Sequence, residues 1–263
     1  LAALVVPRRD GGLVVGSSEA GGIEFYALDG ARLGAIEAGA VVGLDARFGG
    51  ATWIVAALDG TDNRLRFFDL DADSARAQER TAGVIPLGFA AESLCLYRDA
   101  RDATLYAFAL GGAGQIAQYA IQARDGGFGA QLVRQLHVAS EAAYCTADDE
   151  TGDLYVAEQG VGVWRFDADP EAEIVPELID AVRLGRITEE AGGVAIHNAG
   201  DASYLIASDA SADQFHVYDR ANDHAFVGSF VFGDGAASDG VQAAGGLAAS
   251  SFGYGAASPR GLF

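Results

Sequence analysis

A turn rich in carboxylates is the first candidate for chemistry in this chain. Asp148, Asp149 and Glu150 stand together in "ADDETG", and Glu158 follows after a short apolar segment. Carboxylate oxygens suit Ca²⁺, which takes about six to eight oxygen ligands. The trio could instead cap a turn, because Asp side chains accept hydrogen bonds from nearby backbone N–H groups. These four residues are therefore candidate metal ligands, with turn capping as the alternative for the first three.

Other motifs offer weaker chemistry. The stretch "DLDADSARAQER" (69–80) begins like a calcium loop, but Ser74 and Arg80 occupy the positions of the required Gly and Glu, which favours a solvated turn. The four histidines are scattered singly, so a His-based metal site is not expected. Cys95 and Cys145 both lie in short apolar stretches, which favours buried free thiols. A disulfide between neighbouring strands is the alternative, and it would require an oxidising compartment.

Short apolar strands recur along the chain and must position these side chains. One three-strand phrase repeats, and its opening segments lie at 2–6, 41–48, 91–97, 142–147, 192–197 and 245–250. An aligned aromatic residue lies near the end of the third strand in five phrases: Tyr26, Phe68, Tyr119, Phe166 and Tyr218. Repeats of about 40–50 residues built from short strands are typical of a β-propeller. A pair of β-sandwiches would not explain the regular aromatic residue.

Six opening segments predict an all-β fold, a six-bladed β-propeller of four-stranded antiparallel sheets. The 263 residues then form a single domain, 1–263, with about 44 residues in each blade. Propellers host many functions, so the fold by itself decides none.

Composition excludes some partners. The chain has 37 acidic and 17 basic residues and a net charge of −20, and every basic residue is Arg. Such a chain repels phosphate backbones, so we expect no nucleic-acid partner. No apolar run approaches the roughly 20 residues of a membrane-spanning helix, so we expect no transmembrane segment. The chain starts at Leu1 rather than Met, which is consistent with a removed leader.

Four stretches resemble a known family. They are "GGIEFYALDGARL" (21–33), "VVGLDARF" (41–48), "DDETGDLYVAEQGVGVWRF" (148–166) and the closing segment 234–263. In this order they resemble the β-propeller phytases, calcium-dependent enzymes that remove phosphates from inositol hexakisphosphate. The resemblance covers essentially the whole chain. It implies a bacterial protein that is secreted, periplasmic or outer-membrane associated.

The resemblance also implies site residues, and only some are kept. Glu158, Glu190 and Asp239 match carboxylates of the family and are the remnant catalytic candidates. Glu158 and Asp239 join the acidic turn as candidate metal ligands. Family carboxylates or amides are replaced elsewhere, at Ala143-Tyr144, Gln159, Gly192, Ala210 and Gly245. Phosphate-binding lysines are replaced at Glu19-Ala20 and Gly112, and the arginine loop of the second blade reads "LDGTDN".

These losses predict a degraded calcium and phosphate site. We expect calcium, if it binds, at reduced occupancy or at peripheral turns, and inositol phosphate to bind weakly or not at all. The first hypothesis is a non-catalytic or weakly catalytic accessory domain beside a phytase domain in the same chain. The second is an active calcium-dependent phosphatase on phytate or lower inositol phosphates, working through Glu158, Glu190 and Asp239. The third is a protein-interaction propeller.

Overall fold

The structure of the protein is a computed structural model that describes residues 2–18, 21–235, 239–256 and 258–263. Almost all regular secondary structure in these ranges is β-strand. The exception is a short 3-10 helix, η1 (Arg220–Asn222). In the same ranges no helix is long and apolar enough to cross a membrane.

Five antiparallel sheets follow one another along the chain, and the strands of each pair in sequence order. The first sheet contains β1 (Ala3–Arg8), β2 (Gly11–Ser17), β3 (Ile23–Ala27) and β4 (Arg32–Ile36). The second contains β5 (Val41–Phe48), β6 (Trp53–Asp59), β7 (Arg64–Asp71) and β8 (Arg76–Glu79), and β9 (Ile85–Pro86) also pairs with β7. The third contains β10 (Ala91–Arg98), β11 (Leu105–Gly111), β12 (Gln115–Arg124) and β13 (Gly127–His137).

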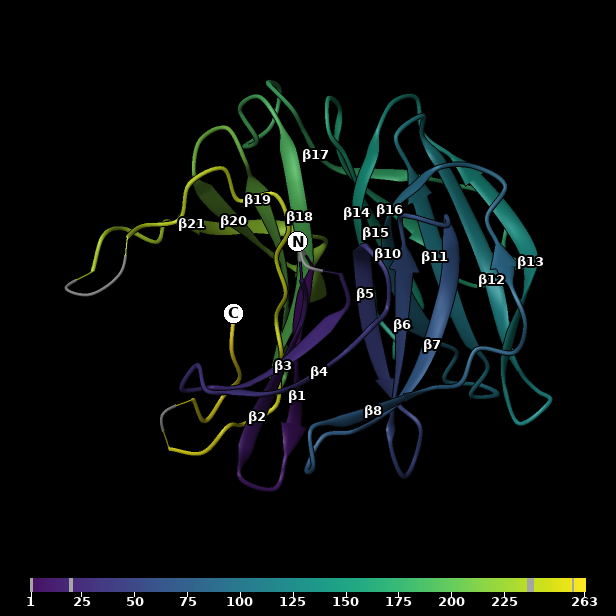
Figure 1. The fold of residues 1–263 in the computed structure, drawn as a ribbon. Coiled ribbons are helices and arrows are strands. Elements are labelled where there is room, and N and C mark those ends of the chain that lie inside the picture. Colours follow the sequence, from purple (N-terminus) through teal and green to yellow (C-terminus); the bar gives the residue numbers. More distant parts are fainter. Residues whose placement is uncertain (1, 19–20, 236–238, 257) are drawn as a thin grey trace.

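The last two sheets have the same plan. The fourth contains β14 (Ala142–Ala147), β15 (Asp153–Glu158), β16 (Gly162–Asp167) and β17 (Glu177–Ala181). The fifth contains β18 (Ala191–Ala199), β19 (Ala202–Asp209), β20 (Gln214–Asp219) and β21 (Ala225–Phe230). The first strands of successive sheets contact one another, so β1, β5, β10, β14 and β18 form the inner wall of a propeller (Figure 1).

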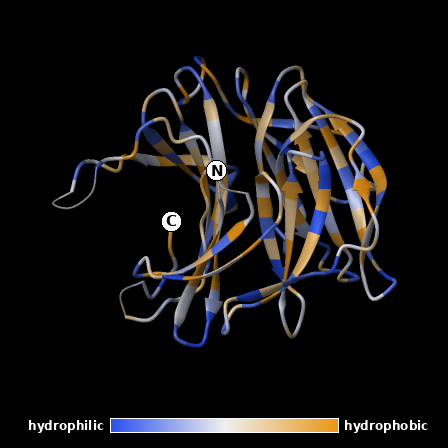
Figure 2. Ribbon diagram, viewed as in Figure 1, coloured by the Kyte–Doolittle hydropathy of each residue, from blue (hydrophilic) through white to orange (hydrophobic). Residues whose placement is uncertain are grey.

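Apolar side chains hold neighbouring blades together. Figure 2 shows hydrophobic residues concentrated in the strands and hydrophilic residues concentrated in the loops. Phe25 and Phe68 are buried in the core between the first two blades, and Tyr155 and Tyr218 are buried between the last two. Such face-to-face packing of sheets buries apolar area, which is the main stabilising term in folding.

The aligned aromatic residues lie at equivalent places, as the repeat predicted. Each is on the third strand of its blade and pairs with the second strand: Phe68 with Val55, Tyr119 with Ala107, Phe166 with Leu154, Tyr218 with Leu205, and Tyr26 with Val14. The partner lies four residues before the end of the second strand in four blades, and three residues before it in the first blade. The periodic aromatic therefore marks one structural position.

The prediction of six blades is wrong, because the described residues form five. The sixth opening segment, 245–250, follows β18, with Gly193 N–H donating to Gly245 carbonyl oxygen, but it builds no sheet. Its only ladder contact among the described residues is one bridge between Ser250 and Leu262. The residues between these two include Gly253, Gly255 and Pro259, which favour turns over strands.

This closing segment nevertheless joins the two ends of the propeller. In Figure 1 it passes between the fifth blade and the first. Asn198 N–H, on β18, donates to Ser251 Oγ (2.8 Å), and Tyr254 Oη donates to Val5 carbonyl oxygen on β1 (3.3 Å). It therefore occupies the place on the inner wall that a sixth inner strand would have.

Candidate functional site

A central cavity of about 880 Å³ runs between the inner strands and the closing segment. The inner strands begin at one mouth of this channel, here called the entry mouth, and end at the other, called the exit mouth. Contacts at the exit mouth show that the strand ends meet there. Arg98, which ends β10, donates from Nη2 to Phe48 carbonyl oxygen (3.4 Å) and from its backbone N–H to Asp149 Oδ1 (3.0 Å).

Four inner strands carry a β-bulge at the entry mouth. The register slips by one residue in each strand, between Val41 and Gly43, Ala91 and Ser93, Ala142 and Tyr144, and Ala191 and Val194. A bulge re-aims a side chain and is common next to active sites. The bulged positions include Ala143 and Gly192, where the sequence resemblance implies carboxylates. The bulges thus place the expected ligand positions at one mouth, but at these two the ligands are absent.

The entry mouth still collects negative charge. Burial raises the pKa of Glu141, and the carboxylates of Glu92 and Glu190 raise it further. Burial, with Glu141 and Glu190, also raises the pKa of Tyr144. Sequence reasoning singled out Glu190 but missed Glu92 and Glu141. Their spacing could have revealed them, because Glu92, Glu141 and Glu190 follow one another at intervals of 49 residues, close to the repeat length.

Glu158 is held inside its own blade. Its side chain is about 1% exposed. Ser140 donates to Glu158 Oε1 from N–H and from Oγ (2.6 and 2.7 Å), and Trp164 Nε1 donates to Oε2 (2.7 Å). Asp209, at the matching position of the fifth blade, likewise accepts from Thr188 N–H and Oγ (2.7 and 2.8 Å). In both blades the carboxylate at the end of the second strand holds the loop that precedes the inner strand.

Glu190 lies nearer the opening of the entry mouth. Gln159 Nε2 donates to Glu190 Oε1, and Ser211 Oγ lies 3.5 Å from Oε2. Gln159 is one of the positions where the resemblance implies a second carboxylate, so an amide donor now pairs with the carboxylate that is kept.

A tyrosine fills the space beside the lost carboxylates. A side-chain carbon added at Gly245 would lie only 2.5 Å from Tyr144 Oη, and one added at Gly192 would overlap Ser208 Oγ and come within 2.9 Å of Ala244 carbonyl oxygen. Both glycines stand where the resemblance implies acidic side chains. The protein has therefore packed a phenol and backbone into volume that ligands would need.

The acidic turn lies at the opposite mouth. Asp148 Oδ1 accepts from Glu150 N–H (2.7 Å), which is the turn-capping alternative, and Asp148 Oδ2 pairs with Arg220. Asp149 accepts from Arg47 Nε (2.9 Å). Glu150 is exposed. Because β14 spans six residues, or about 20 Å, this trio and Glu158 cannot serve one metal cluster.

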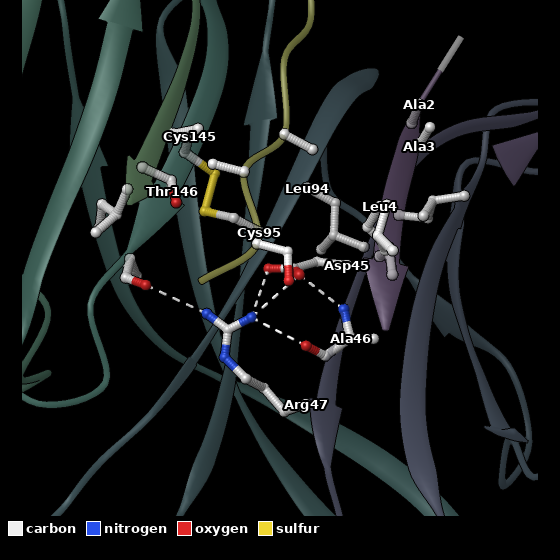
Figure 3. Close-up of a pocket in the computed structure, with 18 of the residues that line it drawn as sticks. Ala2, Ala3, Leu4, Asp45, Ala46, Arg47, Leu94, Cys95, Cys145 and Thr146 are labelled. Atoms are coloured by element: carbon white, nitrogen blue, oxygen red, sulfur yellow. Dashed lines mark hydrogen bonds and ion pairs between the residues drawn. A yellow bond between two sulfur atoms is a disulfide. The ribbon is translucent and has the colours of Figure 1, made fainter. Parts of the chain in front are cut away.

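Arg47 forms ion pairs with two carboxylates of this region, Asp45 and Asp149. Figure 3 shows its guanidinium in the channel wall beside Asp45. Arg47 Nη1 donates to both oxygens of Asp45 (3.1 Å each), and Nη2 donates to the carbonyl oxygens of Leu96 and Ala147 (2.6 and 3.2 Å). With Asp149, these contacts tie three inner strands together.

The remaining predicted positions are not brought to a common site. Asp239 is exposed and lies outside the strands. Glu19 and Ala20 lie outside the described residues.

The two cysteines form a disulfide, so the expectation of free thiols is wrong. Cys95 on β10 and Cys145 on β14 have Cα atoms 5.7 Å apart. Figure 3 shows the bond in the channel wall. The pair forms because both residues lie in the middle of successive inner strands, which the propeller places side by side.

Comparison with known proteins identifies the family. A family model described as Phytase matches residues 7–263. This chain belongs to the phytase family. Among curated relatives, a 3-phytase of Bacillus subtilis (strain 168) is 27% identical over 264 residues, which covers 95% of this chain and 69% of that protein.

Solved structures agree on the fold. A functionally unknown protein from Desulfotomaculum acetoxidans DSM 771 superposes with a TM-score of 0.60 at 16% identity, covering 86% of this chain and 70% of that one. BBS1N, solved in complex with ARL6DN, gives 0.56 at 10% identity, covering 88% and 71%. At such identities the likeness concerns the propeller architecture alone.

The phytase family implies calcium, and the residues present do not fit a calcium cluster. In the described part of the chain no three His, Cys, Asp or Glu side chains are grouped so that they could hold a metal ion. The candidates are split between two mouths, and Asp148, Asp149 and Glu158 already accept hydrogen bonds from protein donors.

Proposed function

We propose that this phytase-family propeller is a non-catalytic or weakly catalytic accessory domain with a degraded calcium and phosphate site. The observation that carries the proposal is that a side-chain carbon added at Gly245, at the entry mouth, would lie 2.5 Å from Tyr144 Oη. This supports the proposal, because the Tyr144 phenol lies where a side chain at Gly245 would begin. A carboxylate at Gly245 would therefore require the Tyr144 ring to move.

The electrostatics of the entry mouth support the same proposal. Phosphoryl transfer requires cations that meet the negative charge of the substrate and of the transition state. Here Glu92, Glu141 and Glu190 gather at the mouth, and the chain contains no lysine. A substrate with many phosphates is repelled by such a field.

The disulfide supports a location outside the reducing cytosol. Cys95 and Cys145 are cross-linked in the folded chain, and disulfides persist in oxidising compartments. We place the domain in a secreted, periplasmic or outer-membrane-associated phytase, next to an intact phytase domain in the same chain. In that setting it would assist substrate capture, stability or presentation of its neighbour.

Two measurements test the proposal. Phytate hydrolysis by this chain, compared with the Bacillus subtilis 3-phytase at matched calcium, should be slower by more than about a hundredfold, since even one lost transition-state contact costs about 10²–10³. Calorimetric titration with Ca²⁺ should show no set of three or more tight sites. Turnover of phytate, or of lower inositol phosphates, at rates near those of the 3-phytase would overturn the proposal in favour of an active phosphatase.

A further inference from the structure

The exit mouth carries three aromatic side chains that are left open to the channel. Phe48 ends β5, Trp53 begins β6, and Phe252 belongs to the closing segment. The ring centroids of Phe48 and Trp53 are 5.4 Å apart, and those of Trp53 and Phe252 are 6.2 Å apart, both edge to face. Phe48 and Phe252 are 52% and 53% exposed. All three line the cavity, and clustered aromatic rings in a concave site are typical of ligand binding.

Polar groups with unused hydrogen-bonding capacity complete this mouth. Asn198, near the end of β18, accepts from Ser203 Oγ at Oδ1 (2.6 Å), and Asn198 N–H donates to Ser251 Oγ. Within the described ranges, the Nδ2 hydrogens of Asn198 and the indole N–H of Trp53 meet no protein acceptor. There, too, the Glu150 carboxylate meets no protein donor. The rim thus offers free donors and a free acceptor.

Charged side chains of both signs lie at this mouth. The Arg98 guanidinium bonds only to carbonyl oxygens, those of Ala103 and Phe48, so its positive charge has no carboxylate partner among the described residues. Glu150 supplies one free negative charge. Arg47 pairs with both Asp45 and Asp149, so these three side chains carry one net negative charge. This excess of one negative charge disfavours an anion, and a neutral polar molecule can use both the free Arg98 guanidinium and the free Glu150 carboxylate.

We propose that the exit mouth binds a neutral, polyhydroxylated ring of the pyranose or cyclitol class. Such a ring has a C–H face that can lie on Phe48, Trp53 or Phe252. Its rim of hydroxyls both donates and accepts, which matches the free donors of Asn198 and Trp53 and the free acceptor of Glu150. This site is at the opposite end of the channel from the family ligand positions and needs no metal.

The test uses the whole chain in calcium-free buffer with EDTA, so that the outcome does not depend on the proposed function. Cellobiose, methyl β-glucoside and myo-inositol are titrated separately, with binding followed by saturation-transfer NMR and calorimetry. Protons on the C–H face of the bound ring should receive the most saturation. Phe252→Ala should weaken binding by at least about fivefold, the equivalent of one aromatic contact. The sugars and the cyclitol distinguish the two sources of this chemistry.

Matched variants locate the site. Phe226→Ala removes another exposed Phe, on β21 away from the channel, and should leave affinity unchanged. Glu150→Gln should weaken binding modestly, and because Glu150 is exposed it should not unfold the chain. Three results would overturn the proposal: no binding of any neutral ring, binding that Phe252→Ala does not change, or preferential binding of a quaternary ammonium probe.

Discussion

Replacing Glu158 by Gln distinguishes a structural carboxylate from a metal ligand. The variant keeps the shape of the side chain but replaces one oxygen by an NH₂ group. Ser140 donates twice to one oxygen of Glu158, and Trp164 donates to the other. In either orientation of the amide, an N–H group must therefore face another donor in a buried place.

The magnitude follows from these contacts. A buried donor without a partner costs about 1–3 kcal/mol, and hydrogen bonds to an ionised group are roughly twice as strong as neutral ones. We expect Glu158→Gln to lower the free energy of unfolding by about 2–4 kcal/mol. For a chain of this size that corresponds to a fall in Tm of roughly 5–15 °C.

The assay is thermal unfolding in EDTA and again in excess calcium. A structural Glu158 gives the same loss of Tm in both buffers, and the exposed control Glu150→Gln gives almost no loss in either. A metal ligand behaves oppositely. Removing its charge would leave Tm unchanged or raised in EDTA, and would abolish any stabilisation by calcium. Observation of that second pattern would refute the structural role argued for Glu158.

Three further predictions concern stability and the entry mouth. Cys95→Ser with Cys145→Ser should lower the free energy of unfolding by roughly 4 kcal/mol, as expected for a closed loop of about 50 residues, and denaturant unfolding with and without reductant measures it. Burial lowers the pKa of His224 from 6.5, so the unfolded chain binds a proton at a higher pH than the folded chain does. Stability should therefore fall as the pH drops below about 6.5. The midpoints of urea unfolding should depend less on pH in His224→Gln. Ala143→Glu should fold and should bind Ca²⁺ more tightly than the unaltered chain, as measured by calorimetry. Gly192→Glu should lower the free energy of unfolding, because its side chain meets backbone. Equal stability of the two variants would contradict this packing.

Much of the fold could be predicted from local pattern. Alternating apolar residues and a recurring aromatic residue located the strands. The aromatic recurs because its position, occupied by Phe68 and Tyr218 in two of the blades, is buried between neighbouring blades. The number of blades could not be read in this way. Segment 245–250 has the apolar pattern of an opening strand, but a strand becomes a sheet only if partners follow it, and the residues after Ser250 form turns.

The candidate site was less predictable, because successive turns of a blade lie at opposite ends of the channel. Glu158 and the 148–150 turn are close in sequence, yet one strand separates them, and that strand carries them to opposite mouths. The disulfide shows the converse. Cys95 and Cys145 are distant in sequence but one repeat apart, so a prediction built on the repeat could have paired them.

The proposed loss of the site can be tested at the entry mouth. Replacement of ligands by small residues alone would leave a cavity. A cavity lowers stability, because the side chains that line it lose van der Waals contacts. Tyr144 instead occupies the space beside Gly245, and burial of its ring recovers apolar contact. We therefore expect changes at these two positions to be energetically coupled. Introducing Asp at Gly245 alone should clash with the phenol, whereas the double change Tyr144→Gly with Gly245→Asp restores both the space and a carboxylate. A requirement for paired reversion at these two positions would support the proposed accessory role of the domain.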